Sequence, residues 1–359
     1  MAGKIKILVV GCGQMGTSHA RAYHNMDGCE IVGVVSRGPE SRGRLAGELG
    51  GATEYDDFRK ALEATKPDAV CISTYPETHV DFAVASMEAG AHVFLEKPIA
   101  EDNEGAERVV AAARKHNKKA VIGYILRHHP AWTRFIETAR TLGKPLVMRM
   151  NLNQQSSGDK WRGHKNLMNS LSPIVDCGVH YVDVMCQMTG ARPIRVQAIG
   201  ARLSDELKPG MYNYGNLQVV FDDGSVGWYE AGWGPMISEE AFFVKDVVGP
   251  RGCASIADRK KERGEGSSAD IESHTATHSI RIHHADLDAD GNFAKQDEWV
   301  DTTGEPDHDE LCRREQEYFV KAIREDIDLT EHLTAAVDSL RIVLAADQSI
   351  REGKVISLE

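Results

Sequence analysis

Residues 5–16 read IKILVVGCGQMG, an apolar run that leads directly into the pattern Gly-x-Gly-x-x-Gly. The run at 7–10 is typical of a buried parallel strand, and Met15, His19 and Met26 then recur at helical spacing. Glycines at such a strand-to-helix turn let the backbone approach a pyrophosphate, and the helix N-terminus offers it unpaired N–H groups and a positive dipole. An ordinary glycine turn has the same pattern, but this flanking context favours a dinucleotide site. Its predicted contacts are Gly11, Gly13, Gln14, Met15 and Gly16.

Strand and helix patterns alternate through the first third of the chain. This alternation is the signature of right-handed βαβ units, which build a parallel sheet covered by helices on both faces. The first domain is therefore predicted to be of the α/β class, Rossmann-like and doubly wound, and to span residues 1–124. The expected strands are 5–10, 30–35, 68–74, 91–95 and 119–124, and the expected helices are 39–49, 57–65, 77–88 and 103–116.

After residue 124 the pattern changes to strands separated by turns. One linking helix is expected at 130–142, and the sequence DDGS at 222–225 supplies a hairpin turn. Strands without helices between them indicate an antiparallel or mixed sheet, so residues 125–359 are predicted to form an α+β domain whose C-terminal helix can pack back on the first domain. The expected strands are 146–152, 194–201, 217–221, 226–231, 271–284 and 298–301, the expected surface loop is 251–266, and the expected closing helices are 307–326 and 329–352.

Composition and charge exclude several classes of protein. The 359 residues are 42% hydrophobic and include 54 acidic and 42 basic side chains, for a formal net charge of -12. No basic run interleaved with aromatic residues is present, so nucleic acid is not an expected partner. No apolar stretch approaches the roughly 20 residues of a membrane helix and no signal-peptide pattern is present, so a cytoplasmic protein is predicted. The seven cysteines lack disulfide or zinc spacing and are expected to be reduced.

The end of the second expected strand carries the residues that select the cofactor. In the NAD-specific form of this fold, an acidic residue about 20 residues beyond the glycines binds the ribose 2′-hydroxyl. Here that place is taken by Ser36 and Arg37. A hydroxyl beside a guanidinium suits a 2′-phosphate, so the predicted cofactor is NAD or NADP, with NADP favoured. Arg37 is also compatible with a solvated loop charge, in which case the protein takes NAD or both.

The segment SPIVDCGVHYVD, which starts at Ser172, is the most informative part of the second half. It begins like a helix, with Ser172 as the N-cap and Pro173 at the first helical position. Asp176 and His180 are four residues apart and share one helical face, so the carboxylate can orient the imidazole as a general base. A structural role for His180 stays open, because satisfied buried histidines are common. Gly178 indicates a close approach to that face, either by a bound ring or by helix packing.

Lys97 supplies a second chemical group. It follows the strand expected at 91–95, and ligands of open α/β sheets bind outside the carboxyl ends of the strands. An ammonium there can hydrogen-bond a substrate hydroxyl and stabilise the alkoxide that develops as hydride leaves the carbon. A solvated loop charge is an equally good interpretation of Lys97 taken alone.

Four motifs occur in order: GCGQMG at 11–16, TYPETH at 74–79, EKP at 96–98 and DCGVHYVD at 176–183. Together, along almost the whole chain, they resemble the glucose-fructose oxidoreductase, inositol dehydrogenase and rhizopine-catabolism (Gfo/Idh/MocA) family of NAD(P)-dependent oxidoreductases. The resemblance implies a Rossmann domain followed by a domain built on a large open, mostly antiparallel sheet, which is often buried in a dimer or tetramer. It also implies a catalytic set at Lys97, Asp176 and His180. The further cofactor contacts that it implies are Thr74, Tyr75, Pro76, His79, Glu96 and Lys97.

The chain departs from the family pattern where members of the family meet their substrate. MNSLSP at 168–173 replaces a glycine-rich run, and LRH at 126–128 replaces a double arginine. The loop with Trp161 can close over a sugar ring or be a surface loop with one anchoring tryptophan. No metal is expected, since the histidines at 274, 278, 283 and 284 form no recognisable ligand set. The expected substrate-binding residues are Lys97, Arg127, Trp161, Arg162, His164, Asp176 and His180.

These features predict an oxidoreductase that interconverts a secondary hydroxyl and a ketone on a cyclic polyol, sugar or sugar derivative. In this hypothesis His180 accepts the hydroxyl proton, Asp176 orients His180 and Lys97 steadies the oxygen, while hydride passes to nicotinamide C4. Two other classes stay open: a redox-assisted glycosidase with tightly bound NAD, and a catalytically silent sensor that binds NAD(P). The expected partners are a small carbohydrate or polyol and further copies of the chain, in a homodimer or homotetramer.

Overall fold

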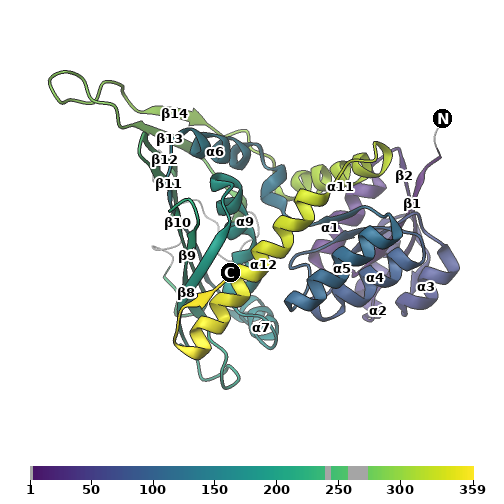
Figure 1. The fold of residues 1–359 in the computed structure, drawn as a ribbon. Helices are drawn as coiled ribbons and strands as arrows, with labels where there is room; N and C mark the ends of the chain where they lie inside the picture. The colour runs from purple at the N-terminus through teal and green to yellow at the C-terminus, as the bar shows by residue number, and fades with distance from the viewer. Residues whose placement is uncertain (1–2, 239–243, 258–273) are drawn as a thin grey trace. The chain divides into compact units, whose positions relative to one another are not determined.

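The structure is a computed structural model, and it describes residues 3–238, 244–257 and 274–359. Within these residues, no helix combines the length and the apolar composition needed to cross a bilayer. The chain forms two compact units (Figure 1). The first comprises Met1–Ile125 and Asp307–Val337, and the second comprises Leu126–Pro306 and Asp338–Glu359. Residues 307–337 are thus grouped with the first unit, whereas the sequence analysis assigned them to the second domain.

The first unit is built on a six-stranded sheet in the order β3-β2-β1-β4-β5-β6. All neighbouring strands are parallel, and the chain changes its direction of travel across the sheet beside β1. This is the strand order of a dinucleotide-binding Rossmann sheet, and it confirms the predicted doubly wound architecture. The strands are β1 (Ile5–Val10), β2 (Cys29–Val35), β3 (Glu54–Tyr55), β4 (Ala69–Ile72), β5 (His92–Leu95) and β6 (Ala120–Ile122).

Helices pack on this sheet, and local sequence sets where they begin. Asp57, for example, caps α3 by accepting a hydrogen bond from the Lys60 amide at 2.8 Å. Helix α11, which is distant in sequence from the rest of the sheet's helices, packs on α1 and β5. Phe319 of α11 thereby joins Tyr23 and Phe94 in the core. The helices are α1 (Gln14–His24), α2 (Pro39–Glu48), α3 (Phe58–Thr65), η1 (Pro76–Thr78), α4 (His79–Glu88), α5 (Asn103–His116) and α11 (His308–Arg324).

The second unit contains a nine-stranded sheet in the order β14-β13-β12-β11-β7-β10-β9-β8-β15. Neighbouring strands are antiparallel except for β7 and β10, which run parallel near the centre. This large, mostly antiparallel sheet confirms the predicted α+β architecture. The strands are β7 (Val147–Gln155), β8 (Pro193–Ala201), β9 (Tyr214–Phe221), β10 (Val226–Gly234), β11 (Lys245–Gly249), β12 (Gly252–Ala257), β13 (Ser279–His284), β14 (Glu298–Asp301) and β15 (Ile356–Ser357).

The surface loop expected at 251–266 was wrong in its first part, because β12 occupies Gly252–Ala257. The sequence GCASIA of this strand has mostly small side chains in place of the branched and aromatic ones that mark strands, so the propensity signal was weak. Residues 258–266 lie outside the described residues. So does the start of the strand expected at 271–284, of which β13 forms the end.

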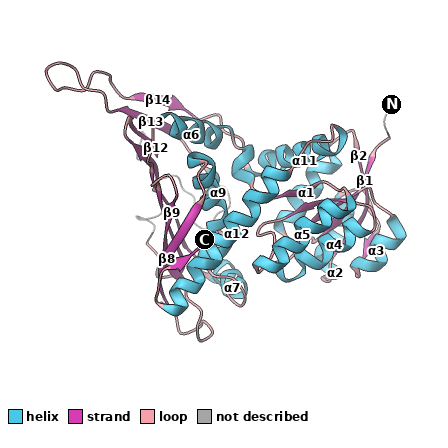
Figure 2. Cartoon of the chain, viewed as in Figure 1, coloured by secondary structure: helices cyan, strands magenta, loops and turns pink. Residues whose placement is uncertain are grey.

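Helices of the second unit lie along one face of its sheet (Figure 2). The second part of α12 belongs to this layer, since Ser349 Oγ accepts from the Ala198 amide of β8 at 2.9 Å. On the other face, Val147, Val226 and Val248 are exposed at matching register positions of three adjacent strands. That face therefore exposes a row of apolar side chains, next to the ion pair between Arg149 and Asp246. The helical segments are η2 (Ile125–His128), α6 (Pro130–Thr141), α7 (Gly158–Leu167), α8 (Pro173–Asp176), α9 (Gly178–Thr189) and α12 (Thr330–Glu352).

Candidate functional site

The glycine turn joins β1 to α1 in the first unit. Gly11 has a φ of 99°, and a Cβ there would overlap the Ser73 carbonyl oxygen, while a Cβ on Gly16 would overlap the Gly11 carbonyl oxygen. Both glycines are therefore required by the fold itself. Gly13 differs, because a Cβ on this N-cap of α1 would meet no atom of the described residues within 4 Å. The open side of the turn, next to the N–H groups of a helix N-terminus, fits a dinucleotide pyrophosphate.

A second arginine accompanies the residues predicted to select the cofactor. Ser36 is half-buried after β2, and Arg37 beside it is exposed. Arg42 of α2 donates to the Ser36 carbonyl oxygen at 2.5 Å and to Glu54 Oε2 at 3.1 Å. Arg42 was not predicted from the sequence, because its approach to Ser36 depends on how α2 turns back after β2. Two guanidinium groups, those of Arg37 and Arg42, thus lie at the end of β2, and Arg42 is hydrogen-bonded to the carboxylate of Glu54.

His79 ties together two loops at the carboxyl edge of the parallel sheet. Its Nδ1 lies 2.8 Å from the Pro98 carbonyl oxygen, and its Nε2 lies 3.0 Å from the Thr74 carbonyl oxygen. Burial lowers the pKa of His79, and its two carbonyl partners oppose that shift. The imidazole therefore links the loop after β4 to the loop after β5. Contacts of His79, Thr74, Tyr75 and Pro76 with the cofactor stay predictions.

Glu96 and Lys97 follow β5. The Glu96 side chain is buried, with Oε1 2.7 Å from His19 Nε2. Its other oxygen, Oε2, accepts from the Lys97 amide at 3.1 Å. The carboxylate thus belongs to the interior of the first unit and fixes the peptide that precedes Lys97. Contact of Glu96 with the cofactor stays a prediction.

The predicted catalytic helix begins as expected and is then interrupted. Ser172 Oγ accepts from the Val175 amide at 3.2 Å, which confirms the predicted N-cap. The expectation of one continuous helix was wrong, because Cys177 separates α8 from α9. At this point the His180 amide donates to the Cys177 carbonyl oxygen, three residues earlier, at 3.2 Å, which tightens the turn locally. Asp176 ends α8, and it is half-buried, as is His180 in the first turn of α9.

Gly178 is explained by packing within the second unit. A Cβ at this position would lie 3.2 Å from both the Tyr229 ring of β10 and the Val343 side chain of α12. Contacts this short are tighter than a side chain tolerates without displacing its neighbours. The glycine therefore lets the start of α9 settle against the sheet and α12, which is the helix-packing interpretation of the two that the sequence left open.

His164 of α7 lies close to Asp176. Its ring stacks on Trp233 of β10 with centroids 4.4 Å apart, and its Nδ1 lies 2.9 Å from Ser156 Oγ. Burial lowers the pKa of His164 to about 4, and the negative charge of Asp176 opposes that shift. His164 is consequently neutral at pH 7. His164 and Asp176, which were both expected to bind substrate, are therefore near enough to interact electrostatically.

Gln154 of β7 contacts Trp233, on which His164 stacks, and it was not predicted from the sequence. Its Oε1 accepts from Trp233 Nε1 at 2.6 Å, and its amide nitrogen donates to His274 Nε2 at 2.8 Å. Gln154 is buried, and buried polar side chains need such partners. The polar run NLNQQ at 151–155, whose side chains are mostly buried within β7, was the available signal.

The segment with Trp161 and Arg162 forms helix α7 rather than the expected loop. Trp161 is 7% exposed, and its Nε1 donates to Glu206 Oε1 at 3.1 Å. Arg162, whose side chain is 71% exposed, pairs with an aspartate of its own helix. The helix was missed because its sequence has few apolar side chains and hence no hydrophobic periodicity. Of the predicted residues in this segment, His164 lies near Asp176, Trp161 anchors the helix and Arg162 lies on the surface.

Arg127 of η2 forms a bidentate ion pair with Asp183 of α9. Its Nε donates to Asp183 Oδ2 at 2.9 Å, and a second guanidinium nitrogen donates to Oδ1. Asp183 is buried and also accepts from Gln187 Nε2 at 2.8 Å. Because a buried carboxylate is costly without its partner, the pair fixes η2 on α9. Contact of Arg127 with substrate stays a prediction.

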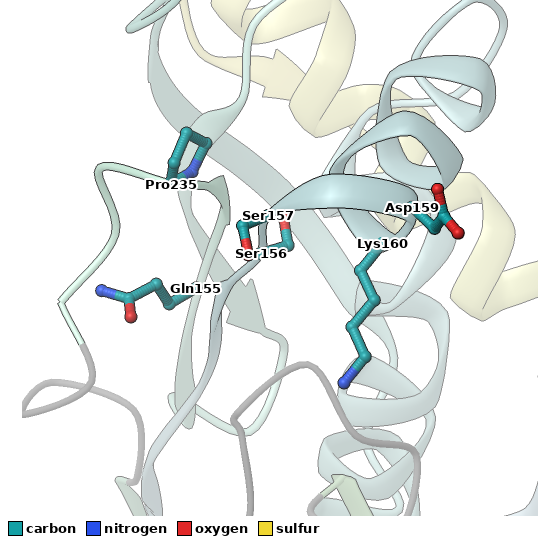
Figure 3. A pocket seen from close by; sticks show the side chains of 6 residues that line it. All are labelled: Gln155, Ser156, Ser157, Asp159, Lys160 and Pro235. Carbon is teal, nitrogen blue, oxygen red and sulfur yellow. The ribbon is translucent and has the colours of Figure 1, made fainter.

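β7 and β10 end at a hollow of about 530 Å³ (Figure 3). The two strands are parallel, with Gly234 opposite Gln155, so their carboxyl ends meet at the same edge of the sheet. The lining side chains carry hydroxyl, amide, carboxylate and ammonium groups, which suit a polar ligand. The residues that line the hollow are Gln155, Ser156, Ser157, Asp159, Lys160 and Pro235.

The histidines between 274 and 284, which the sequence analysis did not assign to a metal, have separate partners. His283 Nδ1 lies 2.8 Å from Asp297 Oδ1, and His284 Nε2 lies 2.9 Å from Glu298 Oε1. These pairs lie on adjacent strands and face different carboxylates, so they share no common centre.

Comparison with known proteins identifies the family. Residues 5–124 match the model of the oxidoreductase family with an NAD-binding Rossmann fold, and residues 136–244 match the GFO/IDH/MocA C-terminal domain. The chain belongs to the Gfo/Idh/MocA family. Membership in this family confirms the resemblance drawn from the four sequence motifs, the oxidoreductase class and the NAD-binding nature of the first unit.

Relatives within the Gfo/Idh/MocA family align with most of the chain. An inositol 2-dehydrogenase of Ralstonia nicotianae is 26% identical over 291 residues, which cover 77% of this chain and 79% of that protein. A D-glucoside 3-dehydrogenase of Escherichia coli is 26% identical over 273 residues, covering 70% and 77% respectively. The crystal structure of scyllo-inositol dehydrogenase from Lactobacillus casei, with bound NAD(H) and scyllo-inositol, superposes with a TM-score of 0.76 at 20% identity and covers 99% of each chain. That likeness concerns the fold.

Proposed function

We propose that this protein is an NAD(P)-dependent dehydrogenase that interconverts a secondary hydroxyl and a ketone on a cyclic polyol, sugar or sugar derivative. The observation that carries the proposal is the placement of Asp176 and His180 on either side of the α8–α9 junction, both half-buried, in a chain whose other unit holds an open glycine turn. Relatives named for the dehydrogenation of inositol and of D-glucosides support this substrate class.

In the proposed mechanism, His180 accepts the proton of the reacting hydroxyl. Asp176 orients the imidazole and stabilises the cation that forms on it. Lys97 donates a hydrogen bond to the same oxygen and steadies the alkoxide as it becomes a ketone. The bound nicotinamide supplies the acceptor for the hydride that leaves the carbon. In the reverse direction His180 returns its proton to the oxygen.

We propose NADP as the favoured cofactor. Ser36 and Arg37 stand where NAD-specific members of this fold carry an acidic residue, and Arg42 adds a second guanidinium beside them. Two cations and a hydroxyl suit a 2′-phosphate. Glu54 is engaged by Arg42, which weakens any repulsion of the phosphate by that carboxylate.

We propose that the sugar ring is bound by hydroxyl-specific hydrogen bonds rather than by charge. His164 is neutral, and Gln154 and Ser156 beside it are uncharged as well. Groups of this kind discriminate between hydroxyl positions on a ring, because a missing hydroxyl leaves a buried polar atom unsatisfied. Among the predicted substrate residues, His164 therefore has the best support, and Trp161 supports the helix that carries it.

We also infer that the chain forms a homodimer or homotetramer through the open face of the nine-stranded sheet. The support is the exposure of Val147, Val226 and Val248 on adjacent strands, because contiguous exposed apolar side chains mark association surfaces. Light scattering on a Val226→Asp, Val248→Asp variant tests this inference. A monomer would agree with it, and a wild-type protein that is itself monomeric would contradict it.

A substrate screen tests the proposed activity. Inositols, aldoses and glucosides are incubated with NAD and with NADP, and the absorbance of the reduced cofactor is followed. We expect net reduction with at least one ring substrate, and a loss in kcat of about 10²- to 10⁴-fold in His180→Ala with cofactor binding retained. The matched control is His24→Ala, which removes an exposed imidazole at the end of α1.

Other outcomes of the screen favour the alternatives. Release of an aglycone without net reduction favours a redox-assisted glycosidase, and bound cofactor without any turnover favours a sensor. Unchanged turnover in His180→Ala removes His180 from the mechanism. The hydroxyl that reacts, and the preferred direction, follow from the products of the same screen.

A further inference from the structure

His19 of α1 is fully buried in the first unit and has a hydrogen-bond partner at each ring nitrogen. Its Nε2 lies 2.7 Å from Glu96 Oε1, and its Nδ1 lies 2.9 Å from Gln316 Nε2. Glu96 follows β5 and Gln316 belongs to α11, so three elements far apart in the sequence meet at one imidazole. A ring held at both nitrogens is fixed in orientation and in tautomer.

The tautomer follows from the neighbouring donors. The Tyr23 hydroxyl donates to Gln316 Oε1, so the amide nitrogen of Gln316 is the end that faces His19. An amide nitrogen only donates, hence His19 Nδ1 accepts and the proton of the neutral imidazole lies on Nε2. His19 therefore donates to Glu96. The hydrogen bonds form one chain from Tyr23 through Gln316 and His19 to Glu96, in which each bond polarises the next.

Glu96 extends this chain to Lys97. While Oε1 of Glu96 accepts from His19, Oε2 accepts from the Lys97 amide at 3.1 Å. Gly123, which follows β6, leaves room for the carboxylate, since a Cβ there would lie 3.2 Å from Glu96 Oε2. One buried carboxylate thus connects the imidazole of His19 to the peptide of Lys97.

A second buried carboxyl group, that of Glu315 on α11, lies near enough to Glu96 to interact with it electrostatically. Glu315 is 1% exposed, and neither of its oxygens has a hydrogen-bond partner among the described residues. Burial, followed by the nearby charge of Glu96, raises the pKa of Glu315 well above its usual value. Glu315 therefore holds a proton more tightly than an ordinary glutamate does, and Glu96 is the carboxylate that accepts from His19 and from the Lys97 amide.

The group formed by His19, Cys312 and Glu315 is better suited to hydrogen bonding than to binding a metal ion. His19, Cys312 and Glu315 bring three potential ligand atoms within 4.8 Å of one another. Both nitrogens of His19 are already engaged, however, and burial raises the pKa of the Cys312 thiol far above neutrality. A transition metal needs a free imidazole lone pair and a thiolate, and neither is offered here.

We propose that His19 is a positioning residue, which acts through Glu96 to aim Lys97 at the oxygen of the substrate. The inference deepens the proposed function and rests on it, because Lys97 is the proposed partner of the reacting hydroxyl. If the Glu96 carboxylate loses its donor, the peptide before Lys97 loses its anchor. A misplacement of about 1 Å in a reacting group can cost about 10²-fold in rate, so the effect falls on kcat more than on substrate binding.

The test compares three variants of the full-length protein: His19→Leu, His19→Gln and His92→Leu. A glutamine can place its amide nitrogen near the position of imidazole Nε2 and still donate to Glu96, whereas a leucine cannot. His92 begins β5 and its Nδ1 accepts from the Lys119 amide at 2.9 Å. The His92→Leu control therefore removes a hydrogen-bonded imidazole from the opposite end of the strand that precedes Lys97.

Hydrogen exchange of the Lys97 amide, measured without substrate, reports directly on its bond to Glu96. We expect exchange about tenfold faster than wild type in His19→Leu, and close to wild type in His19→Gln and in His92→Leu. This measurement does not depend on turnover. A folded His19→Leu protein with unchanged Lys97 exchange overturns the proposal.

Steady-state kinetics test whether the hydrogen bond between the Lys97 amide and Glu96 affects catalysis. We expect His19→Leu to lower kcat about 10- to 100-fold while KM changes less than about threefold, and we expect His19→Gln to restore most of the rate. In double-mutant cycles the loss should disappear in a Lys97→Met background and should add to the loss caused by His180→Ala. A loss that persists in full without the Lys97 ammonium contradicts the proposal.

Two further cases separate failure of a variant to fold, and failure of the proposed function, from failure of the proposal about His19. If His19→Leu does not fold, His19→Asn replaces it, because the asparagine side chain is too short for its amide to reach Glu96. Equal Lys97 exchange rates and equal kcat values in His19→Asn and His19→Gln would then overturn the proposal. If the wild-type protein turns over no ring substrate, the proposed function fails, and the exchange measurement alone decides whether His19 anchors Lys97.

Discussion

Gly13 and Gly16 lie three residues apart in the same turn, yet a Cβ would meet no described atom within 4 Å at Gly13 and would overlap a backbone carbonyl oxygen at Gly16. The space at Gly16 is occupied by the protein, since the Gly11 carbonyl oxygen fills it. The space at Gly13, at the N-cap of α1, holds no described atom within 4 Å and suits a ligand.

This contrast separates a binding role from a folding role. We expect Gly13→Ala to leave the melting temperature within about 2 °C of wild type but to weaken dinucleotide binding about tenfold or more, because the added methyl group displaces the pyrophosphate. Gly16→Ala should destabilise the protein by about 1 to 3 kcal/mol through overpacking. Calorimetric titration and thermal unfolding measure the two effects. Unchanged affinity in Gly13→Ala would show that the pyrophosphate binds elsewhere.

Arg37 provides a test of cofactor preference. Removing a guanidinium that pairs with the 2′-phosphate should raise KM for NADP about tenfold in Arg37→Ala and leave KM for NAD nearly unchanged. Arg59→Ala on α3 serves as a control for the loss of one exposed positive charge. A wild-type kcat/KM at least about tenfold better with NAD than with NADP would contradict the preference, since the extra charges would then have no phosphate to meet.

The raised pKa of Glu315 predicts a dependence of stability on pH. Its pKa is higher in the folded protein than in the unfolded chain, so the folded state binds more protons between those two values. Stability is therefore lost as the pH rises through that window. Glu315→Gln removes the titrating group, and we expect a higher melting temperature than wild type at pH 8 but little difference at pH 4.

Glu317→Gln is the matched control for this prediction, because Glu317 lies on the same helix, is exposed and pairs with Arg313. Its replacement should not produce a gain in stability that grows with pH. If Glu315→Gln changes the melting temperature equally at pH 4 and pH 8, the carboxyl group does not titrate in this range, and its proton is not part of the cluster.

His164 predicts the opposite dependence on pH. Its pKa falls from an ordinary value of 6.5 to about 4 in the folded protein, so the unfolded chain binds more protons between these values. Stability is therefore full above about pH 6.5 and is lost as the pH falls toward 4. His164→Phe keeps a ring to stack on Trp233 without titrating, and its melting temperature should fall less than that of wild type between pH 7 and pH 4. An identical decline in both proteins would show that His164 is not neutral in the fold.

Local pattern was sufficient for the first sheet and for the starts of several helices. The apolar run at 7–10 and the caps at Asp57 and Ser172 carry their signals within a few residues, although the strand at 7–10 then pairs with the distant strands β2 and β4. The strand at 298–301 also forms with the predicted bounds, paired with β13. Where a segment's own residues signal its conformation, the prediction from sequence agrees with the structure.

Interactions between distant segments were beyond this kind of prediction. His19 falls on the apolar face of its helix, so its burial was foreseeable, but Glu96 is 77 residues away and Gln316 is 297 residues away. The helix that carries Trp161 was missed for a related reason, since its position depends on β10 and Glu206 rather than on its own hydrophobic pattern. The residues that orient chemical groups in this protein are therefore the ones that local patterns do not reveal.

Residues 307–359 contribute to both compact units, because α11 completes the core of the first around Phe319, and β15 pairs with β8 in the second. During vectorial synthesis on the ribosome, neither unit can complete its core until residues 307–359 have been made. The nascent chain therefore holds two incomplete, partly apolar units at the same time until that point. Expression conditions that slow synthesis or withhold chaperones should accordingly lower the yield of this protein more than that of one whose first domain closes early.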